Sequence, residues 1–567
     1  MAYKKLLSRS DMLACVLCEE PICSKVCKAK IDPGKLLRSI WFENEEYASL
    51  TLPEKSPCID CGSTDCGTKS DEVPCQKECV INKMSYLNFL SKNVPIKKLV
   101  EKLYEVKAQE HDLSNCHNLN CYSLSVGNGK GNIKSDVKYD IEKHDTTDVN
   151  FSVLKSDICG IPIENPFLLS SSVVASTYDM CARAFDTGWA GACFKTVCNF
   201  PIHECSPRFS ALQGNNNEFI GFKNIEQLSD HTVEENMTIF QQLKKNYPNK
   251  FILASFMGQN EKEWAELAKK CQDAGADALE LNFSCPNMAD GGLGSDIGQI
   301  PELVEKLTHI VKKSVSIPII AKLTPNVANM SPSAEAALKA GADGIAAINT
   351  IKSITGVNLH TFVGDPSVHG KFALGGYSGV AVKPIALRFI AELGQNSMCR
   401  QKNAHITAMG GIENWTDAAE FILLGAKSIQ ITTAVMQYGY RIIEDLKSGL
   451  ALYMNQKGFK SVPEMSGLGL DSFSMSTDTL ERDTIIYPKF IKERCIGCGR
   501  CVISCRDGGH QALSLVCDES VCDDDNRGTN LGSNRRKIRL NAKKCVGCHL
   551  CILVCPQKAM VSSEIRR

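Results

Sequence analysis

The stretch Leu281-Asn282-Phe283-Ser284-Cys285-Pro286-Asn287 lies where one strand of a predicted β/α barrel ends. It places the Cys285 thiol among carboxamide and hydroxyl side chains. Active sites of such barrels lie at the carboxyl-terminal ends of the strands. A thiol there can transfer a proton, so Cys285 is the candidate catalytic residue, and an inert buried thiol is the less favoured interpretation.

Short apolar runs alternate with helical patterns on both sides of this stretch. Alternation over this length predicts an α/β fold, a (β/α)₈ TIM barrel. Between the third and fourth runs, Glu261–Ala274 has a helical period. The eight candidate strands are 166–172, 192–197, 251–257, 278–285, 317–324, 344–349, 405–411 and 428–435.

Polar side chains and glycines fall near the end of nearly every candidate strand. One or two would be ordinary strand termini, but a repeated set of cationic, amide and glycine residues predicts a site at the barrel mouth. The set is Ser171, Lys195, Thr196, Asn282, Ser284, Cys285, Lys322, Thr324, Asn349, Thr350, Gly410, Gly411 and Thr433.

Two features of this set favour FMN. Gly410-Gly411 and Thr432-Thr433 follow or end the last two strands, the usual phosphate position of a barrel. Lys195 and Lys322 lie where an anionic reduced flavin needs positive charge. The alternative is that these lysines pair with buried carboxylates, which we expect to be scarce nearby. A flexible loop is expected at Gly375–Gly379.

Composition limits the class of protein. The chain has 567 residues, with 64 basic and 64 acidic side chains, so no charge excess indicates nucleic acid or an anionic membrane as a partner. It has no apolar stretch of membrane-spanning or signal-peptide length, and we expect a soluble, cytoplasmic protein. We expect an iron–sulfur domain at 1–95, a linker at 96–150, the barrel at 151–480 and a second iron–sulfur domain at 481–567.

Eight of the 29 cysteines form two runs of identical spacing near the C-terminus. This is the bacterial ferredoxin pattern for two [4Fe–4S] clusters, in which the fourth cysteine of each run ligates the other cluster. We assign Cys495, Cys498, Cys501 and Cys555 to one cluster and Cys545, Cys548, Cys551 and Cys505 to the other.

Nine further cysteines lie between Cys15 and Cys79. Two more [4Fe–4S] clusters are the favoured interpretation, zinc is an alternative, and disulfides are disfavoured by the short spacings and the length of the chain. The second group offers five thiols for four positions, since Cys66 lies inside it. The candidate ligands are Cys15, Cys18, Cys23 and Cys27, then Cys58, Cys61, Cys75 and Cys79.

These motifs together resemble dihydropyrimidine dehydrogenase, and more distantly the class 1 dihydroorotate dehydrogenases. The cysteine runs at Cys15–Cys27 and Cys495–Cys555 extend the resemblance over most of the chain. The large family enzyme also has FAD and NADPH domains, for which this sequence shows no strand–GxGxxG–helix unit. The matching barrel stretches are Phe194-Lys195-Thr196, Asn224-Ile225-Glu226, Gly275–Asn282, Ser284-Cys285-Pro286, Ala321–Val327, Asn349-Thr350 and Gly375-Gly376.

The resemblance implies reduction of the 5,6 double bond of uracil or thymine at FMN, with Cys285 protonating C5. A thiol has an ordinary pKa of about 8.5, so it is protonated at neutral pH. Amide and hydroxyl groups suit the donors and acceptors of a pyrimidine edge. The implied substrate-binding residues are Asn224, Glu226, Asn282, Ser284, Asn349 and Thr350. The implied FMN-binding residues are Ser171, Lys195, Thr196, Asn224, Asn282, Lys322, Asn349, Gly376, Gly410, Gly411, Thr432 and Thr433.

Electrons are expected to come from a separate FAD-containing, NAD(P)H-dependent reductase subunit or a ferredoxin, in a homodimer or hetero-oligomer. Two alternatives stay open. One is oxidation of a carboxylated dihydropyrimidine, as in the dihydroorotate enzymes; the other is a ferredoxin-like carrier with a vestigial barrel, in which Lys195, Cys285 and Lys322 would be replaceable.

Overall fold

The computed structural model describes Cys18 and residues 32–52, 149–214, 218–287, 294–517 and 536–563. These residues fall into two compact units, one ending at Phe473 and the other beginning at Ser474. Within the described residues, no helix is long and apolar enough to cross a membrane.

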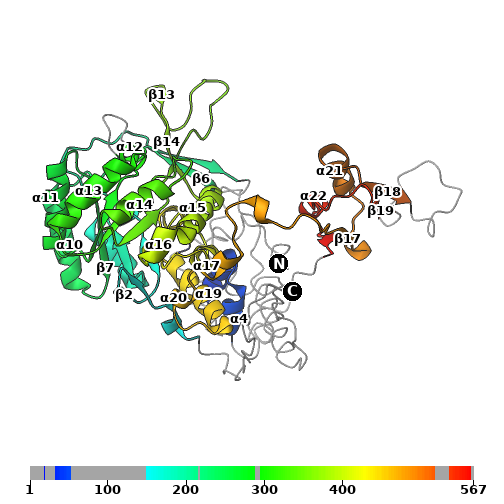
Figure 1. Ribbon diagram of the computed structural model, residues 1–567, viewed down its shortest axis with the longest axis horizontal. Coiled ribbons are helices and arrows are strands. Elements are labelled where there is room, and N and C mark those ends of the chain that lie inside the picture. Colours follow the sequence, from blue (N-terminus) through cyan, green and yellow to red (C-terminus); the bar gives the residue numbers. More distant parts are fainter. Residues whose placement is uncertain are drawn as a thin grey trace, which may run out of the picture. The chain divides into compact units, whose positions relative to one another are not determined.

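The first unit is built around a closed barrel of eight parallel strands in the order β10-β15-β16-β3-β4-β7-β8-β9 (Figure 1). The barrel and its identity as a TIM barrel are therefore confirmed. Each expected strand exists but is shorter than predicted, mainly because the polar residues at its carboxyl end leave the ladder. The strands are β3 (Phe167–Leu169), β4 (Gly191–Cys193), β7 (Phe251–Phe256), β8 (Ala278–Asn282), β9 (Ile319–Lys322), β10 (Gly344–Ala347), β15 (His405–Ala408) and β16 (Ser428–Ile431).

Amphipathic helices surround the barrel and bury one face against it. Two glycines in the left-handed conformation, Gly275 (φ +94°) and Gly341 (φ +102°), lie in the turns that lead into β8 and β10. Two residues after each glycine, an aspartate side chain accepts a hydrogen bond from the backbone of a neighbouring strand. The helices are α9 (Tyr178–Thr187), α10 (Val233–Asn246), α11 (Glu261–Asp273), α12 (Ser295–Gly298), α13 (Pro301–Ser314), α14 (Ser331–Lys339), α15 (Lys383–Gln395), α16 (Ser397–Gln401), α17 (Trp415–Leu423), α18 (Thr433–Tyr438), α19 (Ile442–Lys457) and α20 (Val462–Met465).

A four-stranded antiparallel sheet, in the order β11-β14-β6-β5, is inserted into two of the loops at the carboxyl end of the barrel. It consists of β5 (Phe209–Gln213), β6 (Phe219–Asn224), β11 (Ile351–Ser353) and β14 (Gly375–Ser378). The expected loop at Gly375–Gly379 is thus wrong: most of it is a strand. Glycine is needed there because a Cβ on Gly375 would lie 2.6 Å from the Asn224 carbonyl oxygen.

A projecting arm between β11 and β14 carries the short hairpin β12 (Ser367–Val368) and β13 (Lys371–Phe372) (Figure 1). The buried Lys223 of β6 fastens its base, since Nζ donates to the carbonyls of Asp365 (2.9 Å) and Ala373 (2.8 Å). Burial lowers the pKa of this ammonium, and Asp365 opposes that effect. The arm therefore leaves and rejoins the sheet at a fixed point.

The amino-terminal end of the barrel is closed by the hairpin β1 (Ser156–Ile158) and β2 (Ile161–Ile163), whose isoleucines join a core inside the barrel. At this end His405 is buried, and its Nε2 lies 2.8 Å from Ser428 Oγ. Its Nδ1 has no hydrogen-bond partner among the described residues. Burial lowers the pKa of His405 to about 4.

The N-terminal helices α3 (Pro33–Trp41) and α4 (Glu45–Leu50) pack on α19. Asp445 of α19 accepts a hydrogen bond from Ser39 (2.6 Å) and lies within hydrogen-bond distance of Asn44 (3.3 Å). Arg441 donates to the carbonyl of Cys18 (2.9 Å). The described part of the N-terminal segment is therefore fixed to the barrel. The rest of the expected N-terminal domain, and the expected linker up to residue 148, lie outside the described residues.

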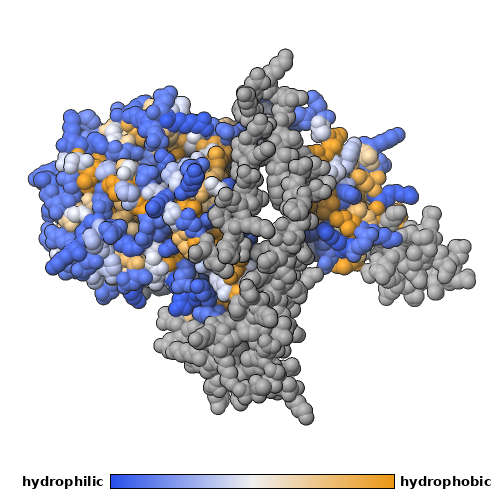
Figure 2. Space-filling model, turned by 90° about the horizontal axis from the view of Figure 1, so that it is seen from below, coloured by the Kyte–Doolittle hydropathy of each residue, from blue (hydrophilic) through white to orange (hydrophobic). Residues whose placement is uncertain are grey.

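The second unit pairs β17 (Pro488–Phe490) with β20 (Met560–Ser562) and β18 (Leu513–Cys517) with β19 (Arg536–Leu540). The helices α21 (Arg500–Gly508) and α22 (Leu550–Leu553) each follow the start of one cysteine run. Several of its large apolar side chains are exposed, Leu553 at 81%, and Figure 2 shows hydrophobic surface on this unit.

Candidate active site

A pocket with about 1120 Å³ of empty space, some of it open to solvent, lies at the carboxyl end of the barrel. Strand ends and the inserted sheet supply its walls. Three predicted site residues do not line it: Ser284 and Gly376 lie directly behind residues that do, and Thr324 Oγ1 instead accepts a hydrogen bond from Asn326 N (3.2 Å). The predicted residues that line it are Ser171, Lys195, Thr196, Asn224, Glu226, Asn282, Cys285, Lys322, Asn349, Thr350, Gly410, Gly411, Thr432 and Thr433.

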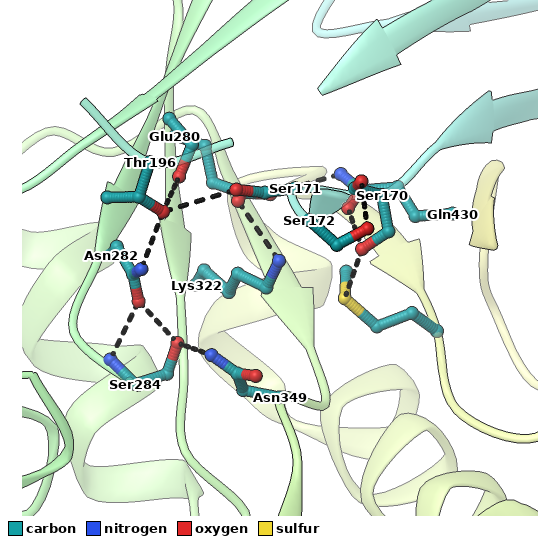
Figure 3. A network of polar contacts seen from close by, with 12 residues as sticks. Ser170, Ser171, Ser172, Thr196, Glu280, Asn282, Ser284, Lys322, Asn349 and Gln430 are labelled. Carbon is teal, nitrogen blue, oxygen red and sulfur yellow. Dashed lines mark hydrogen bonds and ion pairs between the residues drawn. The ribbon is translucent and has the colours of Figure 1, made fainter. Parts of the chain in front are cut away.

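A hydrogen-bond chain fixes two carboxamides, Asn282 at the end of β8 and Asn349 just after β10 (Figure 3). Asn282 Nδ2 donates to Thr196 Oγ1 (2.8 Å), and its Oδ1 accepts from Ser284 Oγ (2.9 Å). Asn349 Nδ2 donates to Ser284 Oγ (2.8 Å). Ser284 therefore orients both amides from behind the wall, and each carboxamide presents a defined donor and acceptor side.

Cys285 lies in the wall just after this chain, and its side chain is buried with 6% exposure. Its carbonyl accepts from Ser295 N (3.0 Å). Gly294 (φ +56°) passes so close that a Cβ there would lie 2.5 Å from the Cys285 carbonyl oxygen. The Cys285 carbonyl is thus held by the segment at Gly294-Ser295, and the thiol lies in the wall of a pocket whose lining includes the amides Asn282 and Asn349.

Both predicted lysines line the pocket, but the expectation that few carboxylates lie near them was wrong. Lys322 Nζ is 3.1 Å from Glu280 Oε1. Lys195 Nζ is 3.6 Å from Glu226 Oε1 and 3.8 Å from Glu204 Oε1. Glu280 was overlooked because it lies inside a strand, on the face that points into the barrel, and the other two come from segments between strands.

Glu226 lies in the pocket wall beside Lys195 and Arg208. Burial raises the pKa of its carboxyl, and Lys195 opposes that shift. Asn287 Nδ2 donates to the Glu226 carbonyl and to Asn224 Oδ1 (3.2 Å), so the segment after Cys285 is joined to β6.

The other end of the pocket is suited to a phosphate. Gly410 (φ +120°) and Gly411 (φ +79°) line it in left-handed conformations, and glycine is needed at Gly411 because a Cβ there would lie 2.8 Å from Lys383 N. Thr433 Oγ1 and Ser378 Oγ lie 2.8 Å apart beside them. Backbone amides and hydroxyls here, with Lys322 deeper in the pocket, fit the phosphate and ring of FMN.

Sequence reasoning missed several lining residues, among them Phe209, Phe222 and Tyr377 of the inserted sheet and Gln430 of β16. The sheet has no period-two signal strong enough to reveal it. Gln430 did carry a signal, because it is a lone amide between Ile429 and Ile431 in an apolar strand.

The second unit contains two cavities lined by the cysteines of the two runs. One is lined by Cys495, Cys498, Cys501 and Cys555, and the other by Cys505, Cys545, Cys548 and Cys551. This is the division in which the fourth cysteine crosses to the other cluster. The backbone repeats as well: Gly497 N donates to Cys495 Sγ and Gly547 N to Cys545 Sγ, both at 3.4 Å.

The described residues contain no group of three or more Cys, His, Asp or Glu side chains placed to hold a single metal ion. Four thiols around a cavity suit an iron–sulfur cluster, whose irons keep the ligands apart, better than zinc, which draws four ligands to about 2.3 Å. Of the eight predicted N-terminal ligands, Cys18 is described, and Cys15, Cys23, Cys27, Cys58, Cys61, Cys75 and Cys79 lie outside the described residues.

Comparison with known proteins agrees with this architecture. The family model for dihydroorotate dehydrogenase matches residues 153–454, and that for a 4Fe-4S dicluster domain matches residues 489–562. The expected C-terminal pair of clusters is therefore confirmed.

Three curated relatives illustrate the similarity. The NAD-dependent dihydropyrimidine dehydrogenase subunit PreA of Escherichia coli K12 is 52% identical over 360 residues, 64% of this chain and 87% of the relative. The chloroplastic dihydropyrimidine dehydrogenase (NADP(+)) of Arabidopsis thaliana is 35% identical over 339 residues, 58% and 80% of the two chains. The dihydroorotate dehydrogenase B (NAD(+)) catalytic subunit of Pyrococcus abyssi is 36% identical over 323 residues, 56% and 99%. The chain belongs to the dihydroorotate dehydrogenase family, and it joins that family's barrel to a 4Fe–4S dicluster domain.

Proposed function

We propose that the chain is the catalytic subunit of a dihydropyrimidine dehydrogenase, which reduces the 5,6 double bond of uracil or thymine. The observation that carries the proposal is Cys285 in the wall of a pocket whose neighbouring donors and acceptors are the fixed amides Asn282 and Asn349. The 52% identity to a dihydropyrimidine dehydrogenase subunit supports it.

Most residues of the pocket divide into two sets, and Asn224, Asn282 and Asn349 would contact both FMN and the pyrimidine. Ser171, Lys195, Thr196, Lys322, Gly410, Gly411, Thr432 and Thr433 would hold FMN, with Gly376 shaping the wall behind Thr350. Asn224, Glu226, Asn282, Asn349 and Thr350 would hold the pyrimidine, with Ser284 orienting two of them. When bound, FMN supplies a hydride for C6 of the pyrimidine.

Cys285 then acts as the general acid. Its Sγ proton passes to C5 of the ring as the C6–H bond forms, and the resulting thiolate regains a proton from solvent. The amides keep the ring in plane and exclude water from its edge, so that C5 faces the thiol.

Anaerobic assay with a low-potential electron donor tests the substrate. We expect turnover of uracil and thymine and none of orotate. Turnover of orotate or dihydroorotate alone would favour the dihydroorotate-type reaction and contradict the proposal.

Electrons would reach the pocket through iron–sulfur clusters that are bound by the cysteine runs. We propose [4Fe–4S] clusters at both ends of the chain, with Cys18 held to the barrel by Arg441 as part of the N-terminal set. Anaerobically purified protein should then contain about sixteen irons, four for each of four clusters. About eight irons would mean that the N-terminal set holds zinc or nothing, and zinc analysis separates those outcomes.

We further propose that a flavoprotein reductase subunit or a ferredoxin delivers the electrons, in a homodimer or hetero-oligomer. NAD(P)H releases electrons as a pair, whereas clusters pass them singly, so a flavin outside the pyrimidine pocket is needed. A reducing compartment such as the cytoplasm suits so many reduced thiols. Purified chain with NADH or NADPH and uracil should be inactive until a reductase is added; activity without one would contradict this.

A further inference from the structure

A buried chain of polar groups crosses the floor of the pocket (Figure 3). Glu280 of β8 receives Lys322 Nζ on Oε1 (3.1 Å) and Gln430 Nε2 on Oε2 (3.0 Å). Gln430 Oε1 in turn accepts from Ser170 Oγ (3.1 Å). In the barrel order, β8 and β16 are four strands apart in either direction, so Glu280 links opposite sides of the barrel.

Glu280 lies behind the pocket and not in its wall. Its exposed fraction is 0%, and it is absent from the lining residues, whereas Lys322 and Gln430 are among them. Any influence of Glu280 on a bound molecule therefore acts through its field and through the two side chains that it holds.

A contribution to the stability of the fold does not explain why the Glu280 carboxylate is buried here. Burying an ion pair costs desolvation that its attraction often fails to recover, and apolar replacements are frequently as stable. Cys193 adds no second negative charge: burial, and next the Glu280 carboxylate, raise the pKa of its thiol well above the ordinary value, so it stays neutral. Glu280 and Lys322 thus form a pair whose net charge is zero below the pocket.

We propose that Glu280 is a positioning residue that fixes the Lys322 ammonium toward the flavin site and offsets part of its charge, which lowers the reduction potential of the bound FMN. The inference rests on the proposed function. Reduction adds negative charge to the flavin, so a lysine beneath it favours the reduced form and a carboxylate behind that lysine opposes the effect.

The test is the FMN reduction potential of the holoenzyme, measured by anaerobic equilibrium titration against a reference dye. Cluster absorbance is subtracted with FMN-stripped protein. Glu280→Gln should raise the reduced-to-oxidised ratio at fixed potential at least about tenfold, which is about 30 mV for a two-electron couple. Lys322→Met should shift the potential in the opposite direction.

Two further variants separate charge from packing. Glu280→Asp keeps the charge and should leave the potential near that of the wild type, even where FMN affinity falls. Glu280→Met replaces the carboxylate with an apolar side chain of similar length and should raise the potential as Glu280→Gln does, which keeps the test available if Glu280→Gln does not fold.

An unchanged or lower potential in folded, FMN-loaded Glu280→Gln or Glu280→Met would overturn the inference. The measurement needs bound FMN but no pyrimidine turnover. A shifted potential without uracil reduction would therefore count against the proposed substrate alone, and failure of the wild type to bind FMN would overturn both.

Discussion

The two ends of the barrel both bury polar side chains, but they use them differently. At the carboxyl end, Asn282, Lys322 and Asn349 take part in hydrogen-bond chains and also face a pocket. At the amino end, His405 is buried against Ser428 beneath the β1–β2 hairpin and lines none of the described pockets. A buried polar residue therefore indicates a site where it borders a cavity or is hydrogen-bonded to a residue that does; elsewhere it reports on packing.

The sharpest test of this contrast is Cys285→Ala at the mouth. Loss of a general acid should reduce pyrimidine reduction by about 10²–10⁴-fold, because the proton for C5 must then come from water. FMN content, iron content and the thermal unfolding midpoint should stay close to those of the wild type.

The matched control is Cys271→Ala in α11, a thiol that is also buried but lies outside the pocket. It should lower stability slightly and leave turnover intact. Wild-type turnover in Cys285→Ala would contradict the role of Cys285 as the general acid, and with it the chemical difference between the two ends of the barrel.

At the amino-terminal end of the barrel, we expect pH to change the free energy of unfolding and not the rate of pyrimidine reduction. The pKa of His405 is lowered to about 4, so between about pH 6.5 and 4 the unfolded chain binds a proton that the native chain does not. Stability should therefore fall as the pH falls through this window, with His405 contributing about 3 kcal/mol.

Replacing His405 with Gln keeps a nitrogen near Ser428 and removes the titration. Urea unfolding at pH 6.5 and at pH 4 should show a smaller loss in His405→Gln than in the wild type. Equal losses would show that the histidine is not the group responsible.

The smallest expected effect is at the phosphate end of the mouth. Thr433→Val removes a hydroxyl that lies 2.8 Å from Ser378 Oγ, while the side-chain shape is kept. We expect FMN affinity to fall about tenfold, in the range of one hydrogen bond to a charged group. Equilibrium dialysis of FMN measures it.

Thr308→Val serves as the control, because Thr308 is buried in α13 away from the pocket. It should leave FMN affinity unchanged. Equal affinity in both variants would argue against a phosphate at Thr433.

Sequence patterns predicted the barrel well because its parallel strands are apolar runs of regular spacing. They predicted the mouth well because glycines and amides at strand ends have few structural reasons to recur. They failed for Glu280, whose partner Lys322 lies 42 positions away in the sequence and is brought beside it by strand pairing. They also failed for Phe209 and Tyr377, which reach the pocket only because two separate insertions pair as one sheet.

The two hydrogen bonds that Lys223 donates at the base of the projecting arm have a practical consequence. Because Lys223 holds the carbonyls of Asp365 and Ala373, the span between them is a closed loop whose length can change without moving β14. At its turn, Gly370 has open space where a Cβ would point. Lengthening a closed loop costs little, since doubling it adds only about 0.6 kcal/mol. The turn at Gly370 is therefore a suitable point to insert a tag or a fluorescent reporter while the pocket wall that holds Asn224 stays in place.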